Sequence, residues 1–140
     1  MVNWNFIVLL ISAIFATSCA AQKQEQQDGL VKGTIGIYEG NCKPGPGIPP
    51  CEPRPISNII YFTQKSERFN PTLVIDSVQS KPDGSYEISL PVGSYSLFLK
   101  DGDQVVCDLI QCPEVCYCSP FEITEDTVLI IDANLDHATW

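Results

Sequence analysis

The sequence predicts an all-β domain, an antiparallel β-sandwich of about seven short strands held together by disulfides. Three observations predict this fold. Apolar and polar residues alternate over several short segments after residue 28, as they do in half-buried strands. Turn residues separate these segments, and 11 prolines and 9 glycines keep interrupting the chain, which disfavours helices. Seven cysteines in 140 residues are typical of an oxidising compartment.

The first half of the domain has three loosely alternating segments. The strands expected here cover residues 30–38, 56–63 and 72–80. In the first of them Ile35 and Ile37 share a face, and Gly33 is expected at a β-bulge. The second contains the apolar run 59–62, which is typical of a buried strand.

The second half has the clearest strand pattern. Pro82-Asp83-Gly84, Pro91-Val92-Gly93 and Asp101-Gly102 are turns built from the residue types that turn geometry favours. Between them, apolar residues alternate with serines, a glutamate and a lysine, so each segment has one buried face. The expected strands are 85–90, 94–100, 104–110 and a last one that starts at 128 and runs to about 140.

The segment from Asp83 to Leu97 resembles the signature of carboxypeptidase-regulatory-like domains, which are transthyretin-like sandwiches. Further similarity to small envelope lipoproteins of the Bacteroidetes type lies in Gly40-Asn41 with Pro44-Gly45, in 59–62 and in Ala138-Thr139-Trp140. The resemblance covers most of residues 29–140, with the 107–118 segment as a local insertion. It implies the fold, an envelope location and an accessory or binding role without catalytic residues.

The N-terminus predicts export. The apolar run 6–16 is shorter than the roughly 20 residues that a membrane-spanning helix needs, and it suits the core of a signal peptide. The following Ala16-Thr17-Ser18-Cys19 resembles the lipobox of bacterial lipoproteins, in which the cysteine carries the lipid. We therefore expect a signal peptide at 1–18, lipidated Cys19 with a polar tether over 19–28, a sandwich over 29–140, and an outer-membrane anchor.

A second cleavage site remains open. Ser18 and Ala20 also fit an ordinary signal-peptidase site, and the first five residues contain no Lys or Arg. Cleavage there would discard Cys19 and release a secreted, soluble protein. The polar, Gln-rich segment 20–28 favours the lipoprotein, because a segment that cannot build a core suits a tether.

The remaining six cysteines are expected to form three disulfides. They are Cys42, Cys51, Cys107, Cys112, Cys116 and Cys118. The first two flank a Pro-rich loop and are expected to pair, which leaves the other four to pair within a hairpin loop, their connectivity open. Cys116 and Cys118 would share a face in a strand and so reach different partners. The spacing lacks the Cys-x2-Cys pairs of structural zinc sites.

Charge and motifs point away from catalysis. A net charge of −9 disfavours nucleic-acid binding, which needs a basic surface. The only histidine, His137, is expected to be exposed near the terminus. Asp132, Asn134 and Asp136 alternate and are interpreted as the solvated face of the last strand, since a calcium site takes more oxygens than a strand supplies. We expect no catalytic residues, metal or cofactor.

Two loops are the expected working surfaces, residues 42–51 and 107–118, because rigid loops on a sandwich carry recognition. Phe98 and Tyr117 are candidates for stacking on a protein or glycan. The alternatives are that a loop covers Phe98 and that Tyr117 packs against a disulfide. The sequence thus favours a non-catalytic binding or structural module. A secreted protease inhibitor presenting loop 42–51 is the second hypothesis, and a redox protein using Cys116-Tyr117-Cys118 the third.

Overall fold

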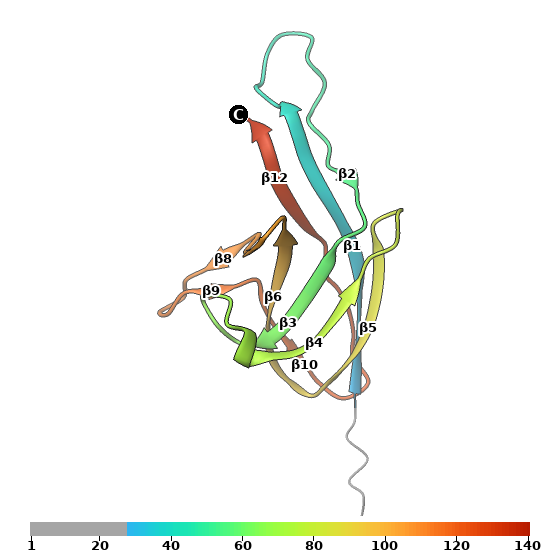
Figure 1. Ribbon diagram of the computed structural model, residues 1–140, viewed down its shortest axis with the longest axis vertical. Coiled ribbons are helices and arrows are strands. Elements are labelled where there is room, and N and C mark those ends of the chain that lie inside the picture. The colour runs from blue at the N-terminus through green and yellow to red at the C-terminus, as the bar shows by residue number, and fades with distance from the viewer. Residues whose placement is uncertain (1–27) are drawn as a thin grey trace, which may run out of the picture.

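The computed structural model describes residues 28–140, and this part of the chain is all-β. It contains twelve strands and one short 3-10 turn, η1 (Pro71–Leu73), within the described residues (Figure 1). The all-β prediction is therefore confirmed. The signal peptide, Cys19 and the tether up to residue 27 lie outside the described residues, and Asp28, expected to end the tether, is the first residue of β1.

The strands are short apart from the first. They are β1 (Asp28–Asn41), β2 (Arg54–Pro55), β3 (Ile59–Gln64), β4 (Val74–Gln79), β5 (Ser85–Pro91), β6 (Gly93–Asp101), β7 (Gln104–Val106), β8 (Ile110–Gln111), β9 (Tyr117–Cys118), β10 (Pro120–Ile123), β11 (Val128–Ile130) and β12 (Ala133–Thr139). The two regular segments of the sequence, 85–90 and 94–100, match β5 and β6 within a residue. The strand expected at 104–110 ends instead at Val106, before the first cysteine of the hairpin.

The described residues form two five-stranded sheets and a separate hairpin. In the first sheet the long β1 pairs with β2 and β5 and with β11 and β12. The second has the order β10-β6-β3-β4, with β7 paired to β6, and all its pairs are antiparallel. Fully buried residues from both sheets, among them Ile35, Ile60 and Leu97, form one apolar cluster. The two layers of a sandwich are thus present.

The first sheet corrects the prediction of an antiparallel fold, because β11 and β12 run parallel to β1. After β10 the chain turns at residues 124–127 and enters the first sheet at the N-terminal end of β1, where Thr127 accepts the backbone N–H of Leu30. The last strands therefore run in the direction of β1. Alternation reports only which residues are buried and carries no information on strand direction.

Gly33 is not at a bulge. The pairing of β1 with β5 runs without a shift from Asp28 opposite Pro91 to Thr34 opposite Ser85. A Cβ atom at Gly33 would lie 1.8 Å from the backbone oxygen of Ile131. The glycine is required by this close approach, at the point where the last strand is interrupted between β11 and β12.

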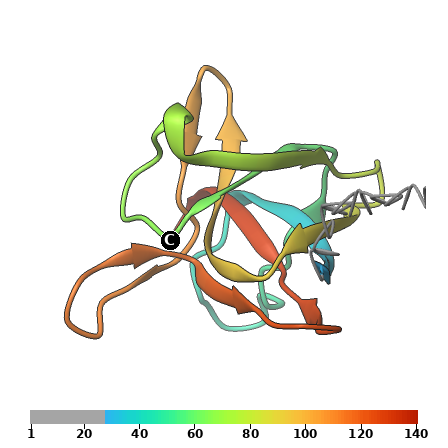
Figure 2. The same ribbon diagram turned by 90° about the horizontal axis from the view of Figure 1, so that it is seen from below.

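The described cysteines form three disulfides, Cys42–Cys51, Cys107–Cys118 and Cys112–Cys116. The predicted division into one pair around the Pro-rich loop and two pairs within 107–118 is confirmed. Cys116 and Cys118 have different partners, as expected, although Cys116 precedes β9 and the two cysteines do not share a strand face. The second group holds β8 and β9 in a hairpin that projects from the side of the sandwich (Figures 1 and 2).

No helix among residues 28–140 is long and apolar enough to cross a membrane.

Candidate functional site

A groove lies between the Pro-rich loop 42–51 and the C-terminal residue, Trp140. The loop leaves the end of β1, and the Cys42–Cys51 disulfide closes it with a Cα–Cα distance of 5.3 Å. The cavity measures about 520 Å³, and Pro44, Ile48 and Pro49 are among its lining residues. This end of the molecule lies opposite the N-terminal end of β1 (Figure 1).

Trp140 is held in a defined orientation at the groove. Its indole N–H donates a hydrogen bond to the Asp136 carboxylate at 2.8 Å, and its ring meets that of Tyr38 edge-on with centroids 5.6 Å apart. The side chain nevertheless stays 58% exposed. An indole that is fixed at its nitrogen and open to solvent is suited to apolar contact with a ligand.

The parallel register explains why Trp140 meets this loop. Asn41 lies opposite Thr139, and the backbone N–H of Cys42 donates to the Thr139 carbonyl at 2.8 Å. Loop 42–51 follows Asn41, and Trp140 follows Thr139. The loop and Trp140 are therefore neighbours. The sequence did not predict that Trp140 lines this groove, because a local sequence pattern carries no information on a contact between residues almost a hundred positions apart.

Within the loop, a tight turn presents Ile48. The N–H of Ile48 donates to the carbonyl of Gly45 at 3.2 Å, and Gly47 has a φ of 74°, a conformation that glycine adopts without strain. Ile48 is 53% exposed. Lys43 adds the positive charge among the groove residues. The groove therefore offers mainly apolar contacts, which the disulfide and the prolines hold in place.

The hairpin 107–118 is the second predicted surface. Leu109, Ile110 and Val115 are exposed on it by 53%, 57% and 56%. At its base Cys118 is fully buried, while Cys112 at the tip is exposed. One contact between the hairpin and the rest of the domain is made by the Asp108 carboxylate, which accepts the backbone N–H of Asn134 at 3.1 Å. Burial raises the pKa of the Asp108 carboxyl, and the negative charge of Asp136 adds to this.

Tyr117 is half-buried in this hairpin. The Lys65 ammonium lies 4.5 Å from the centre of its ring, a cation–π contact that joins the hairpin to the segment after β3. Tyr117 therefore acts first as an anchor of the hairpin, and Lys65 covers one of its ring faces.

The prediction of Phe98 as a surface aromatic has to be corrected, because its side chain is only 1% exposed. Phe69, in the segment between β3 and η1, packs on it with ring centroids 5.6 Å apart and also contacts Tyr61. A loop thus covers Phe98, as the alternative interpretation had it. The aromatic residue in an otherwise polar loop, Ser66 to Asn70, is the sequence signal for this cover.

Two of the three alternating residues near the last strand, Asp132 and Asp136, accept hydrogen bonds from different groups. The Asp132 carboxylate accepts hydrogen bonds from Thr34, while Asp136 accepts the indole N–H of Trp140. Their oxygens therefore do not converge on a common point. Residues 28–140 contain no group of three or more His, Cys, Asp or Glu side chains arranged to hold a metal ion.

His137 connects the two sheets. Its Nε2 lies 2.9 Å from the Asp101 carboxylate at the end of β6. The hydrogen bond and charge of Asp101 raise the pKa of His137, with smaller contributions from Glu39 and Asp136. The imidazole remains open to solvent. The His137–Asp101 contact links β12 to the β6–β7 turn.

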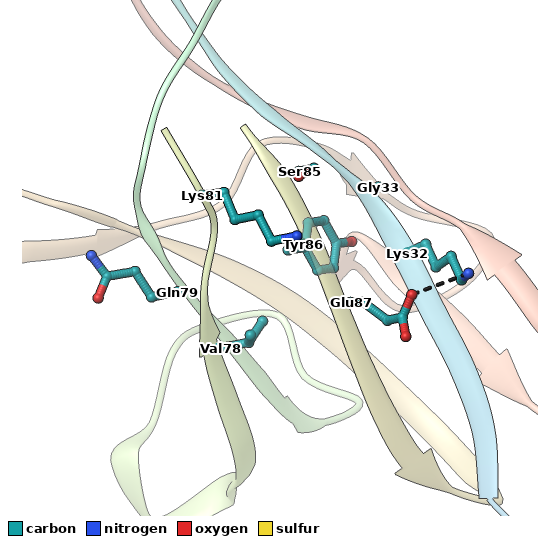
Figure 3. Close-up of a pocket in the computed structure, with 8 residues that line it drawn as sticks. All are labelled: Lys32, Gly33, Val78, Gln79, Lys81, Ser85, Tyr86 and Glu87. Carbon is teal, nitrogen blue, oxygen red and sulfur yellow. Dashed lines mark ion pairs between the residues drawn. The ribbon is translucent and has the colours of Figure 1, made fainter. Parts of the chain in front are cut away.

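A smaller hollow of about 370 Å³ opens between β4 and β5 (Figure 3). The Tyr86 ring stands in its middle, and the Lys32–Glu87 ion pair, 3.1 Å long, lies beyond it. Burial strongly raises the pKa of Tyr86, helped by the charge of Asp132. The phenol stays neutral and donates to the Ile131 carbonyl at 2.7 Å, so its role here is structural.

The fold and the groove define a class: a small, disulfide-bridged all-β domain with a rigid loop facing an exposed aromatic residue. No family model matches the chain, and neither does any curated protein.

Proposed function

We propose that this chain is a non-catalytic lipoprotein of the cell envelope, anchored to the outer membrane through Cys19, whose carboxypeptidase-regulatory-like domain binds a partner. The observation that carries the proposal is the groove between loop 42–51 and Trp140. Of the surfaces described above, it alone combines a rigid apolar wall with an exposed aromatic ring.

The position of the groove suits an anchored protein. The tether would join β1 at Asp28, and the groove lies at the other end of this 14-residue strand. At about 3.3 Å per residue the strand spans roughly 45 Å. A lipid on Cys19 would keep the Asp28 end of β1 within tether reach of the membrane, while the groove at the far end of the strand would be open to protein or glycan partners.

The chemistry of the groove favours a ligand with flat or ring-shaped apolar surfaces. The exposed face of an indole stacks on sugar rings and on proline or aromatic side chains. The prolines and the disulfide restrict the loop before binding, so little conformational entropy is lost when a ligand docks. The net charge of −9 argues against a nucleic acid as this ligand.

The anchor is tested by metabolic labelling with a palmitate analogue. The wild-type chain should carry the label and sediment with membranes, whereas Cys19→Ser should lose both properties. Thr17→Ser, in the same segment, is the matched control and should behave as wild type. A mature chain that begins at Ala21 without lipid would refute the lipoprotein.

The groove is tested by indole fluorescence. Trp140 is the only tryptophan left once the segment that contains Trp4 is removed, so its emission reports on this site alone. Peptide and glycan libraries should contain ligands that shift this emission saturably. Trp140→Ala should abolish their binding and Trp140→Phe should retain part of it. Ligands that bind equally well to Trp140→Ala would place the site elsewhere.

The exposed Ile48 in its disulfide-closed loop favours one second candidate, a secreted protease inhibitor. In that case a protease would accept loop 42–51 in its active site, and Ile48→Asp would abolish inhibition. The soluble chain from Ala21 is assayed against proteases with apolar specificity. An Ile48-dependent inhibition without lipid at the N-terminus would favour the inhibitor over the anchored module.

A further inference from the structure

We infer that the free edge of β11 (Val128–Ile130) is a docking site for an extended segment of another protein, in which two aliphatic residues at alternate positions are flanked by Lys or Arg. The segment adds to the first sheet as an antiparallel strand. This inference goes beyond the proposed function and uses neither the groove nor the anchor. It rests on the unpaired backbone of β11, on its exposed side chains and on the charges beside them.

β11 is an edge strand with unused backbone groups. Among residues 28–140 it pairs with β1 and with no other strand. The carbonyl of Thr127 accepts a hydrogen bond from β1, and the N–H of Ile131 donates one to β1. Because successive residues of a strand direct these groups to opposite sides, the N–H and C=O groups of Val128 and Ile130 point away from β1. They can bond to one more strand, the mode of binding in which a peptide extends a sheet.

The side chains of this edge are aliphatic and exposed. Val128 is 58% exposed and Ile130 69%. Leu129, between them, packs against the core instead. The two exposed side chains therefore stand on the outer face of the sheet, where the side chains of an added strand meet them. An exposed aliphatic edge strand is a template for pairing with another chain.

Acidic residues stand at both ends of the aliphatic pair. Asp126 comes two residues before β11 and Asp132 two residues after it, and both are exposed. Lys32 lies beside β11 on β1, where its ammonium is already paired with Glu87 at 3.1 Å. Opposite charges on neighbouring strands attract. The edge is therefore complementary to a strand that carries Lys or Arg opposite the two aspartates.

The same charges disfavour a second copy of this chain as the occupant. In the register that pairs all of β11 with an antiparallel β11, Leu129 meets its own copy and Asp126 meets Asp132 at both ends. Like charges directly opposite each other on neighbouring strands are destabilising. Charged residues at an edge are a recognised means of limiting self-association. A segment with basic flanks gains attraction at the positions where a second copy is repelled.

The edge is tested with the soluble chain from Ala21 and a blocked synthetic peptide, Lys-Thr-Val-Thr-Val-Thr-Lys, followed by NMR of the backbone amides. The peptide should bind saturably, shift the amide signals of Val128 and Ile130 and slow their hydrogen exchange. The emission of Trp140 should stay unchanged, which separates this site from the groove. Saturable shifts confined to other strands would overturn the proposal, and so would the absence of binding.

Two altered peptides separate the backbone and charge contributions. N-methylation of both valines should abolish binding, because it removes the donors that face β11, whereas N-methylation of the central threonine, whose N–H faces away, should not. Replacing both lysines by glutamate should weaken binding at least about tenfold. Unimpaired binding of the valine-methylated peptide, or equal binding of the lysine and glutamate peptides, would refute the added strand or its charge pattern.

On the protein side, Asp126→Asn should weaken binding of the lysine peptide several-fold. Asp103→Asn is the matched control, since it removes a carboxylate from the β6–β7 turn, outside this edge, and should leave the affinity unchanged. Equal effects of the two substitutions would contradict a local charge pair. Sedimentation should find the chain monomeric. A dimer that Ile130→Lys dissociates would show that a second copy occupies the edge and would overturn the proposal.

Discussion

The Asp132 carboxylate accepts two hydrogen bonds from Thr34, from the backbone N–H at 2.7 Å and from the hydroxyl at 2.9 Å. In an unbroken parallel ladder this N–H would bond to the Ile131 carbonyl. That carbonyl instead accepts the Tyr86 hydroxyl. Asp132 thus bridges the interruption between β11 and β12, and both strands keep the same register along β1.

Loss of the Asp132 carboxylate should weaken the attachment of the segment between β11 and β12 to β1. We expect Asp132→Ala to lower the free energy of unfolding by about 1 kcal/mol, because Thr34 is exposed and water replaces part of the lost bonding. Asp132→Asn keeps an acceptor oxygen and should cost less. Urea unfolding of both variants measures the difference. Equal losses would show that charge rather than the hydrogen bonds matters here.

Gly33 should tolerate no side chain. A Cβ would lie 1.8 Å from the Ile131 oxygen, so Gly33→Ala must displace the backbone that joins β11 to β12. We expect a loss of about 3 kcal/mol or more in unfolding free energy, the size of effect that overpacking produces.

Gly93→Ala is the matched control for this substitution. Its added Cβ would stand 3.5 Å from the Tyr95 ring, an ordinary contact, and its cost should stay within about 1 kcal/mol. Thermal unfolding compares the two variants. A Gly33→Ala protein as stable as Gly93→Ala would contradict the close approach.

Local features of the fold were predictable from sequence, because they depend on neighbouring residues. The strands around Tyr86 and Tyr95 follow from alternation between turns, and the disulfide between Cys42 and Cys51 follows from the loop that it closes. Strand direction was not predictable, since Leu135 is buried equally well in a parallel or an antiparallel pair.

The candidate site shows the same limit. Its loop was predicted, but Trp140 enters the groove only through the parallel register with β1, a long-range relation. Phe98 was misplaced for a related reason. Its position in the strand places the Phe98 side chain on the face opposite Leu97 and Leu99. Phe69, about thirty residues earlier in the chain, covers that side chain. Alternation assigns a face of the sheet, whereas burial depends on what tertiary structure places there.

The Tyr86 hydroxyl should contribute to stability through the Ile131 carbonyl. We expect Tyr86→Phe to lower the free energy of unfolding by about 1 kcal/mol, the net worth of an average hydrogen bond. The raised pKa of the folded phenol also has a pH consequence. Its stabilisation is complete below pH 10, the pKa of an unfolded tyrosine, and declines as the pH rises above that value.

Alkaline titration measures this effect through tyrosinate absorbance at 295 nm. The wild-type protein should show a last ionisation step that coincides with unfolding, and Tyr86→Phe should lack it. The variant should also lose less stability than the wild type between neutral pH and the alkaline transition. A Tyr86 that ionises near pH 10 in the folded protein would contradict its burial.

The contact between His137 and Asp101 should make the domain sensitive to pH near neutrality. The pKa of His137 is raised in the folded protein, so its stabilisation is complete below the ordinary value of 6.5 and is lost as the pH rises through the folded pKa. Because His137 is the only histidine, proton NMR follows its titration without assignment. Asp101→Asn should lower the pKa of His137 toward its ordinary value. Asp103→Asn removes a carboxylate from the same turn and should change that pKa less, so equal effects of the two substitutions would contradict a specific pair.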